Sequence, residues 1–273
     1  MTHYETYIVD VVDKIAHVRL NRPEKANSLA QKGWDELEAI FKDLDRRSDV
    51  RVIVLSGEGK NFSAGIDLEM LMGFSQSLQT KDEGRKREAL RRNVHRLQAP
   101  INAIENCSKP VLAAIHRACV GGAVDIVTAC DMRYCTDDAF FSIEEINVGM
   151  VADLGTLQRL PKLIGEGIVR ELAYTGRRML ADEAYQRQLV NQVYTDKEMM
   201  MASVMDIAKT IATKSPLSVR GTKQVLNFSR DHSVADGLTE KLTLIKPVND
   251  LAGFFLAKCV YRNATCVYLE YAC

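Results

Sequence analysis

Three carboxylates stand in otherwise apolar stretches of the chain. Asp125 lies in GGAVDIVTAC, Glu145 in FFSIEEINVGM and Asp153 in VGMVADLGTL. Charged side chains are rarely buried without a partner, so each predicts either a local structural role or a carboxyl whose pKa is shifted. The structural alternatives are a helix N-cap for Asp153, a bond in the first turn of its own helix for Asp125, and a solvated strand end for Glu145. Together the three acids indicate general acid–base chemistry.

Two glycine-containing turns follow apolar strands, one at 61–67 (NFSAGID) and one at 120–125 (VGGAVD). Glycine lets the backbone approach a ligand closely, and the helix after the second turn aims its free N–H groups at the same spot. The turns could hold an anion or a developing oxyanion, with tight packing as the structural alternative. Neither matches G-x-G-x-x-G or G-x-x-x-x-G-K-[ST], so no nucleotide-phosphate site is predicted.

Other polar candidates give weaker signals. The basic stretch 86–96 could contact RNA or a phosphate-bearing ligand, although a solvated helix face is the simpler interpretation. The five histidines show no H-x-x-x-H spacing and the seven cysteines no C-x-x-C pair, so we expect neither a metal site nor a disulfide framework. The odd cysteine count favours a reducing compartment. Ser63 lacks the G-x-S-x-G pattern of a serine hydrolase.

The elements that position these residues alternate in the first two thirds of the chain. We expect strands at 5–12, 15–20, 51–55, 110–115 and 132–135, and helices at 31–46 and 84–107. After about residue 155 the strand signal nearly vanishes, and we expect helices at 157–164, 168–174, 181–189, 198–214, 216–229 and 234–245. The pattern predicts an α/β layered domain with mostly parallel strands, followed by a helical C-terminal third.

The composition is that of an ordinary globular chain. Of 273 residues, 47% are hydrophobic and 26% charged, which suffices for a sizeable core. Lys+Arg and Asp+Glu both number 36, and the zero net charge argues against a dedicated nucleic-acid or anionic-membrane binder. No apolar run reaches the roughly 20 residues of a membrane span, and no organelle-targeting signal is visible at either end.

Several longer motifs resemble the crotonase (enoyl-CoA hydratase/isomerase) superfamily. They are LNRP with Asn27, the FSAGIDL turn at 62–68, KPV at 109–111 leading into Gly121-Gly122, and CDMR at 130–133. Within that superfamily the chain is most similar to the Δ3,5-Δ2,4-dienoyl-CoA isomerases, through ACDMRYC at 129–135, DAFF at 138–141, ADLGTLQRLP at 152–161 and SRDHSVA at 229–235. The resemblance covers about residues 5 to 235.

The resemblance implies a fold and an assembly. Members fold as a spiral of ββα units with a helical C-terminal oligomerisation region, usually as a dimer of trimers. We therefore expect a spiral core over 1–200 and a helical trimerisation region over 201–273 that diverges after about residue 240. The resemblance therefore predicts that the chain assembles as a homotrimer or homohexamer. Members are commonly mitochondrial or peroxisomal.

The resemblance also assigns roles to individual residues. The backbone N–H groups of Ala64 and Gly122 would form an oxyanion hole for the thioester carbonyl, and Asp125, Glu145 and Asp153 would be the catalytic acids. The substrate-binding candidates are Lys25, Ala26, Ser63, Ile66, Asp67, Leu68 and Gly121. The substrate is an acyl-CoA thioester, so coenzyme A arrives with it and no separate cofactor is expected. Neither a metal nor a nucleic-acid partner is implied.

Three acids suit a proton shift along a conjugated chain. Removing a proton from C2 of a 3,5-dienoyl thioester gives an enolate stabilised by the oxyanion hole, and a second acid can return a proton at C6. One carboxyl must be ionised and the other protonated, which requires pKa values pushed apart. By analogy Glu145 serves C2, Asp153 serves C6 and Asp125 holds or polarises one of them. Which of Glu145 and Asp153 is base and which is acid stays open.

Other functions compete with this interpretation. An enoyl-CoA hydratase typically carries glutamates at both positions 125 and 145 and a neutral residue at 153, so the two aspartates weigh against hydration. A Δ3-Δ2-enoyl-CoA isomerase, an RNA-binding homologue and an inactive homologue are the further alternatives.

Three features depart from the family pattern. Ala123 replaces the third glycine of G-G-G and would add a methyl near the oxyanion hole, and Asn147 stands where Asp is common. The segment 244–273 lacks the family's final amphipathic helices, which leaves trimer assembly and CoA affinity open.

Overall fold

A computed structural model describes residues 4–78 and 82–245. The chain divides into two compact units, Met1–Lys214 and Ser215–Cys273, which are treated separately below. Within the described ranges, no helix is both long enough and apolar enough to cross a membrane.

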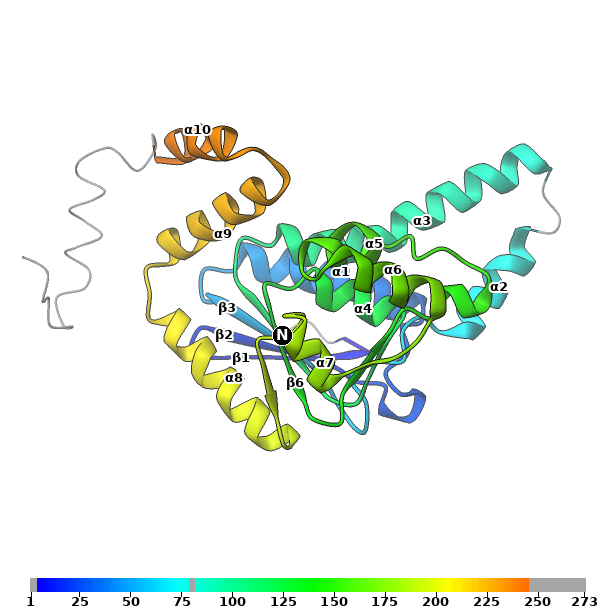
Figure 1. The fold of residues 1–273 in the computed structure, drawn as a ribbon, viewed down its shortest axis with the longest axis horizontal. Coiled ribbons are helices and arrows are strands. Elements are labelled where there is room, and N and C mark those ends of the chain that lie inside the picture. Colours follow the sequence, from blue (N-terminus) through cyan, green and yellow to red (C-terminus); the bar gives the residue numbers. More distant parts are fainter. Residues whose placement is uncertain (1–3, 79–81, 246–273) are drawn as a thin grey trace, which may run out of the picture. The chain divides into compact units, whose positions relative to one another are not determined.

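Parallel strands dominate the larger sheet of the first unit (Figure 1). The described residues form six strands in the order β1-β2-β3-β4-β6-β9. Their bounds are β1 Tyr7–Val12, β2 Ile15–Leu20, β3 Val52–Gly57, β4 Val111–Ile115, β6 Met132–Thr136 and β9 Gln192–Tyr194. Only the β1–β2 pair is antiparallel, and Asp13 and Lys14 form its turn with positive φ angles of 50° and 69°. The hairpin and the mostly parallel sheet predicted from the sequence are confirmed.

A smaller sheet carries one of the two glycine turns. Within the part of the chain that is described, it consists of β5 Ala118–Val120, β7 Phe140–Ser142 and β8 Met179–Leu180. An isolated parallel bridge between Ser63 and Cys119 joins the first turn to β5. The two turns are therefore connected through backbone pairing.

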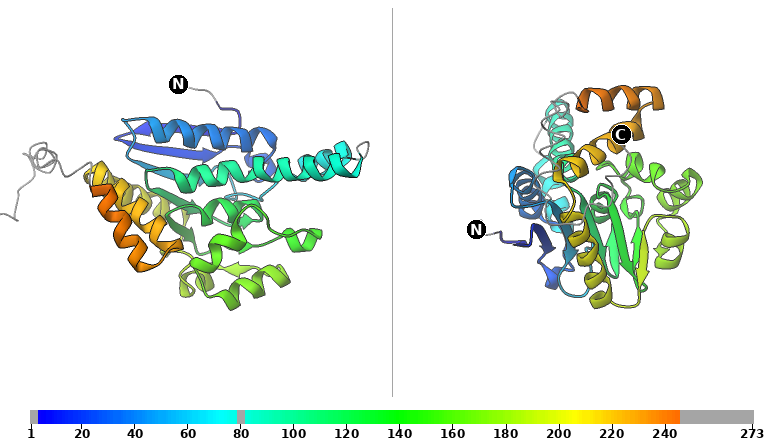
Figure 2. Two further views of the ribbon diagram at one scale, coloured as in Figure 1. Left: turned by 90° about the horizontal axis from the view of Figure 1, so that it is seen from above. Right: turned by 90° about the vertical axis from the view of Figure 1, so that its left-hand side faces the viewer.

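Helices on one face of the large sheet bury the main core. They include α1 Gln31–Arg46, α3 Glu83–Asn106, α4 Gly122–Thr128 and α6 Glu166–Thr175. Trp34, Leu37, Ile40, Phe41 and Leu44 are almost fully buried and recur at spacings of three and four, so α1 forms over the predicted range. Figure 2 shows α1 and α3 side by side, while the first half of α3 extends beyond the sheet.

The opposite face of the sheet is covered by α8, Lys197–Ala212. Met200, Val204 and Ala208 of α8 pack against Val52 and Val54 of β3 in a second apolar cluster. Asp196 caps this helix by accepting a hydrogen bond from the backbone N–H of Met199 at 2.7 Å. The sheet is therefore buried on both sides, as parallel sheets usually are.

Short elements complete the first unit. They are the 3-10 helices η1 Pro23–Lys25, η2 Glu145–Val148 and η3 Leu160–Lys162, and the helices α2 Leu68–Leu78, α5 Thr156–Arg159 and α7 Ala181–Gln186. The sequence did not predict α2, β5, β7, β8 or β9. Strands thus continue past residue 155, since β9 forms the last described strand of the large sheet.

The second unit contributes two described helices, α9 Pro216–Asp231 and α10 Val234–Ile245, which pack against each other. The expected boundary at residue 200 falls inside α8, which packs in the first unit. A trimerisation role for 201–273 stays a prediction. Most of the divergent segment 244–273 lies outside the described residues.

Candidate active site

The two glycine turns lie against each other. The Ser63 N–H donates to the Ala118 carbonyl at 2.9 Å, and the Val120 N–H donates to the Ser63 carbonyl at 3.2 Å. A Cβ atom on Gly65, whose φ is +81°, would lie 2.3 Å from the Val120 oxygen and 3.2 Å from the Gly122 nitrogen. Only glycine permits this approach, so Gly65 fixes the spacing between the turns.

Gly121 and Gly122 start α4 at this junction. Gly121 has a φ of 53° and donates its N–H to the Ser142 carbonyl at 2.9 Å. Gly122 lies over Trp34, because a Cβ on Gly122 would be 3.3 Å from the indole ring. As the first residue of α4, Gly122 presents an N–H that has no intrahelical acceptor. That donor suits the oxyanion role assigned to it.

The expected second donor, Ala64, is engaged. Its N–H donates to the Ala26 carbonyl at 2.9 Å, while the neighbouring Gly65 N–H donates to the Ser63 hydroxyl at 3.1 Å. A thioester oxygen that binds the Ala64 N–H would therefore share this donor with the Ala26 carbonyl, or displace that carbonyl from it. Ala123, directly after Gly122, is fully buried in the main core.

Asp125 is fully buried and connects α4 to α5. Its Oδ1 accepts hydrogen bonds from the Thr156 backbone N–H at 2.6 Å and the Thr156 hydroxyl at 2.7 Å, whereas its Oδ2 is buried without a partner. The alternative of a bond within its own helix is therefore wrong. Burial raises the pKa of Asp125 to about 7; the Thr156 hydrogen bonds oppose the shift and the charge of Glu145 adds to it.

Glu145 faces the second glycine turn. One carboxylate oxygen lies 3.4 Å from the point that a Cβ of Gly121 would occupy, and the other is buried without a partner. The residue is half-buried at the start of η2, so the solvated strand end is not observed. Burial raises the Glu145 pKa, and repulsion from Asp153 and Glu144 raises it further.

Asp153 lies in the loop before α5. It is not a helix N-cap, since Gly155 occupies that position without a side-chain bond. The residue is exposed as a whole, yet partial shielding of its carboxyl raises its pKa. The charge of Asp153 raises the pKa of Glu145, and the charge of Glu145 raises the pKa of Asp125, so the three acids lie close enough to influence one another.

The substrate-binding candidates separate into buried and accessible groups. Ser63 is buried and donates to the Asn27 carbonyl at 2.8 Å. Asp67 pairs with Arg22 at 3.1 Å and accepts the Glu69 N–H at 3.0 Å, which caps α2. These contacts give Ser63 and Asp67 structural roles in shaping the first turn.

The other candidates surround that turn. Lys25 and Leu68 are exposed, Ala26 and Ile66 are half-buried, and Gly121 is buried beneath Glu145. Lys25 reaches Glu69 at 3.4 Å. The accessible part of the predicted binding surface is therefore Lys25, Ala26, Ile66 and Leu68.

The basic stretch 86–96 forms a solvated face of α3. Lys86 pairs with Glu83 at 2.8 Å, and Glu88 accepts from both Arg91 and Arg92. These pairs at spacings of three and four are typical of an exposed helix. Within the described ranges, no group of His, Cys, Asp and Glu side chains could hold a metal ion.

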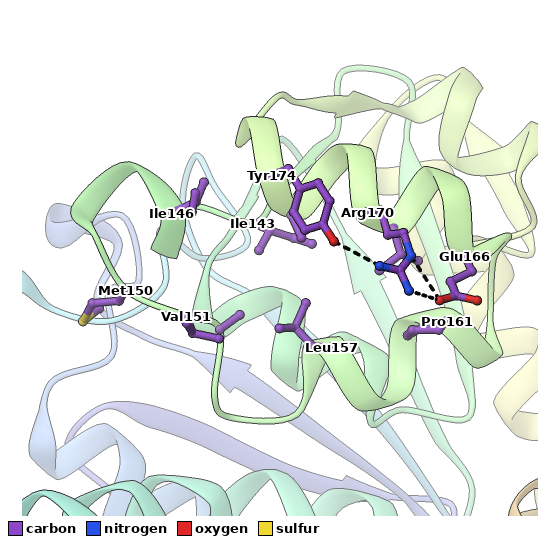
Figure 3. A pocket seen from close by; sticks show the side chains of 12 residues that line it. Ile143, Ile146, Met150, Val151, Leu157, Pro161, Glu166, Arg170 and Tyr174 are labelled. Carbon is purple, nitrogen blue, oxygen red and sulfur yellow. Dashed lines mark hydrogen bonds and ion pairs between the residues drawn. The ribbon is translucent and has the colours of Figure 1, made fainter.

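An apolar cavity of about 300 Å³ adjoins the segments that carry Glu145 and Asp153 (Figure 3). Its walls come from η2, the loop before α5, and α6, and include Ile143, Ile146, Val151, Ala152 and Leu157. Figure 3 shows Tyr174, Arg170 and Glu166 at one side, joined by hydrogen bonds. Neither acid lines the cavity.

Sequence reasoning missed two residues that organise the acids. Thr156 binds Asp125, and Arg159 holds the loop that carries Asp153 through the Leu154 carbonyl at 3.4 Å. Both lie in ADLGTLQRLP, directly after Asp153. The position of Arg159 within a mostly apolar segment was the available signal, because a charge there needs partners.

Known proteins support the resemblance. A family model described as enoyl-CoA hydratase/isomerase matches residues 11–250. A human protein named mitochondrial Δ3,5-Δ2,4-dienoyl-CoA isomerase is 48% identical over 239 residues, covering 86% of this chain and 72% of the relative. A peroxisomal protein of the same name from Arabidopsis thaliana is 50% identical over 225 residues, covering 82% of this chain and 81% of the relative.

Solved structures agree with the fold. The crystal structure of an enoyl-CoA hydratase from Bacillus anthracis is similar to this chain with a TM-score of 0.80 and 28% identity. The similarity covers 96% of this chain and 98% of the other. The expected spiral α/β architecture is thereby confirmed.

Proposed function

Because the chain belongs to the enoyl-CoA hydratase/isomerase family, we propose that it converts 3,5-dienoyl-CoA thioesters into 2,4-dienoyl-CoA thioesters. The observation that carries the proposal is a pair of acids, Glu145 and Asp153: the Glu145 carboxylate lies against the Gly121 turn, and the charge of Asp153 raises its pKa. Such a pair can divide the removal and the return of a proton between two carboxyls.

The reaction begins at C2. Ionised Glu145 removes a C2 proton, and the N–H groups of Gly122 and Ala64 stabilise the negative charge that develops on the thioester oxygen. The charge of the extended enolate spreads along the conjugated chain to C6. Protonated Asp153 delivers a proton there, which leaves double bonds at C2 and C4 and completes a 1,5-proton shift.

The surroundings of each carboxyl suit its role. Glu145 is half-buried with one oxygen lacking a partner, so its ionised form is a stronger base than an ordinary glutamate. After each turnover the exposed Asp153 takes up a proton from solvent, and Glu145 releases the C2 proton that it accepted. Asp125 holds the start of α5, just after Asp153, through Thr156.

A steady-state assay tests the proposal. Purified protein is mixed with 3,5-octadienoyl-CoA while absorbance of the conjugated 2,4-diene is recorded, and hydration of a 2-enoyl-CoA is followed in parallel. We expect rapid diene formation with little hydration, and a loss of about 10²–10⁴-fold in kcat for Asp153→Asn. Hydration alone, or full activity of Asp153→Asn, would refute the mechanism.

The same proposal extends to the setting of the enzyme. Coenzyme A enters as part of the substrate, so we expect turnover to survive exhaustive dialysis against a chelator. The names of the relatives favour a mitochondrial or peroxisomal location, which imaging of the tagged full chain tests. A homotrimer or homohexamer is the expected assembly, and light scattering after gel filtration that gave a monomer would contradict it.

A further inference from the structure

The loop that carries Asp153 is held from α3. The Gln98 side-chain amide donates to the Asp153 carbonyl at 2.7 Å, and the Arg159 guanidinium donates to the Leu154 carbonyl at 3.4 Å. On its other side, Asp125 of α4 binds the Thr156 N–H at 2.6 Å. The backbone from Asp153 to Thr156 is thereby tied to α3 through Gln98 and to α4 through Asp125.

Arg159 is the centre of the α3 attachment. It is 9% exposed and pairs with Glu105 at 2.7 Å, while the same terminal nitrogen donates to Asn102 at 2.8 Å. Gln98, Asn102 and Glu105 follow at spacings of four and three, so they share one face of α3. One helix face thus contacts both the loop and the arginine behind it.

Gly155 makes room for this arrangement. Its φ is +125°, and a Cβ placed there would lie 1.8 Å from a guanidinium nitrogen of Arg159. The guanidinium therefore occupies space that only glycine leaves open, directly against the backbone that follows Asp153. A planar fork can contact Glu105, Asn102 and this backbone at once, which the single ammonium of lysine cannot do.

We propose that Arg159, together with Gln98, is a positioning residue that fixes Asp153 relative to Glu145 and so controls proton delivery at C6. The inference rests on the proposed function and deepens it. Neither side chain touches the reacting atoms in this arrangement. Both act through the backbone of residues 153–155.

The proposal separates two half-reactions. Removal of the C2 proton depends on Glu145 and the oxyanion hole, which do not contact Arg159 or Gln98 in the contacts described above. Delivery at C6 depends on where the loop places Asp153. Loosening the loop should therefore slow isomerisation while leaving proton exchange at C2 intact, because the enolate is then reprotonated at C2.

The test measures both half-reactions in deuterated water. For the full-length chain and for Gln98→Met and Arg159→Met, diene formation is followed by absorbance and deuterium at C2 of the recovered 3,5-dienoyl-CoA by mass spectrometry. A misplacement of about 1 Å costs on the order of 100-fold in rate, so we expect kcat to fall about 10- to 100-fold with KM and C2 exchange unchanged. Equal losses in exchange and isomerisation, or no loss, would overturn the proposal.

Gln98→Met guards against simple unfolding, because it removes one hydrogen bond at a partly exposed site, whereas Arg159→Met removes the buried ion pair with Glu105. Arg159→Lys keeps the charge but not the fork, so its kcat should stay low. The matched control is Arg91→Met, an exposed arginine of α3 that pairs with Glu88 and should change neither half-reaction. A wild-type protein that forms no diene would refute the proposed function, whereas a normal wild type with proportional losses in the variants would refute only the positioning role.

Discussion

Burial shifts pKa values in opposite directions in two polar clusters of the first unit. In the acid cluster, burial raises the pKa of Asp125 to about 7, whereas beside α8 burial lowers the pKa values of His17 and His116 to about 4. His17 contacts the Ser56 hydroxyl at 2.8 Å, and the Lys197 ammonium repels the charged form of His116. Asp125 therefore titrates near neutrality, while the histidines stay uncharged there.

A shifted pKa or an unpartnered buried atom does not by itself mark an active site. His116 also has a buried ring nitrogen without a partner, just as Asp125 and Glu145 each have such an oxygen. The acid cluster differs because its groups repel one another and because Glu145 lies beside the Gly121 turn. Repulsion between carboxyls beside the glycine turn that is proposed to bind the thioester oxygen is what separates the two clusters.

The largest expected contrast is catalytic. Glu145→Gln should lower kcat for diene formation by about 10²–10⁴-fold, because it removes the proposed base while keeping the side-chain shape. His17→Gln should leave kcat unchanged, since its imidazole serves the packing beneath α8. Steady-state assays check both, with thermal melts to show that each variant folds. Comparable losses in the two variants would remove the distinction between the clusters.

A second contrast concerns stability and pH. The folded-state pKa of Asp125, about 7, exceeds its usual 3.8, so the folded state binds more protons and Asp125 costs stability as the pH rises from 3.8 to 7. The cost reaches at most about 4 kcal/mol. Asp125→Asn keeps an acceptor for Thr156 without the charge, so its free energy of unfolding relative to wild type should rise over that range. Urea denaturation at a series of pH values measures this, and a difference that does not vary with pH would contradict it.

Regular patterns made most of the fold predictable. The helix at 31–46 and the hairpin at 5–20 were readable because one carries a repeating apolar face and the other two β-rich runs around a short turn. By contrast, β5, β7 and β9 are three residues long, which is too short for a periodic signal. The α2 helix escaped detection because Gly73 interrupts it and Leu68 and Met72 are exposed.

The acid cluster was predictable as a set of residues but not as a structure. Asp125, Glu145 and Asp153 were recognisable as carboxylates in apolar segments. Their partners were not, because Thr156 and Gln98 are ordinary polar residues whose roles come from tertiary contacts across α3, α4 and α5. Polar partners of this kind carry no periodic pattern, so only coordinates reveal them.

The histidine cluster should give a pH slope opposite to that of Asp125. Its folded pKa values, about 4, lie below the usual 6.5, so its stabilising contribution is complete above pH 6.5 and is lost as the pH falls toward 4. Each histidine accounts for at most about 3 kcal/mol. The double variant His17→Gln/His116→Gln should flatten this part of the stability profile. If urea denaturation showed that the double variant loses as much unfolding free energy as the wild type when the pH falls from 6.5 to 4, other groups would be the cause of that loss.

The smallest expected effects come from a matched pair of buried hydroxyls. Ser56→Ala removes the partner of His17, and Thr156→Val removes a hydroxyl partner of Asp125; each should cost about 1 kcal/mol in unfolding free energy. Only Thr156→Val should affect catalysis. The Thr156 hydroxyl lowers the pKa of Asp125. Its loss should therefore shift the limb of the pH–rate profile that reflects Asp125 to higher pH, whereas Ser56→Ala should leave the profile unchanged. If both profiles coincide with that of the wild type, Asp125 titrates without influencing the reaction, and its role is confined to holding α5.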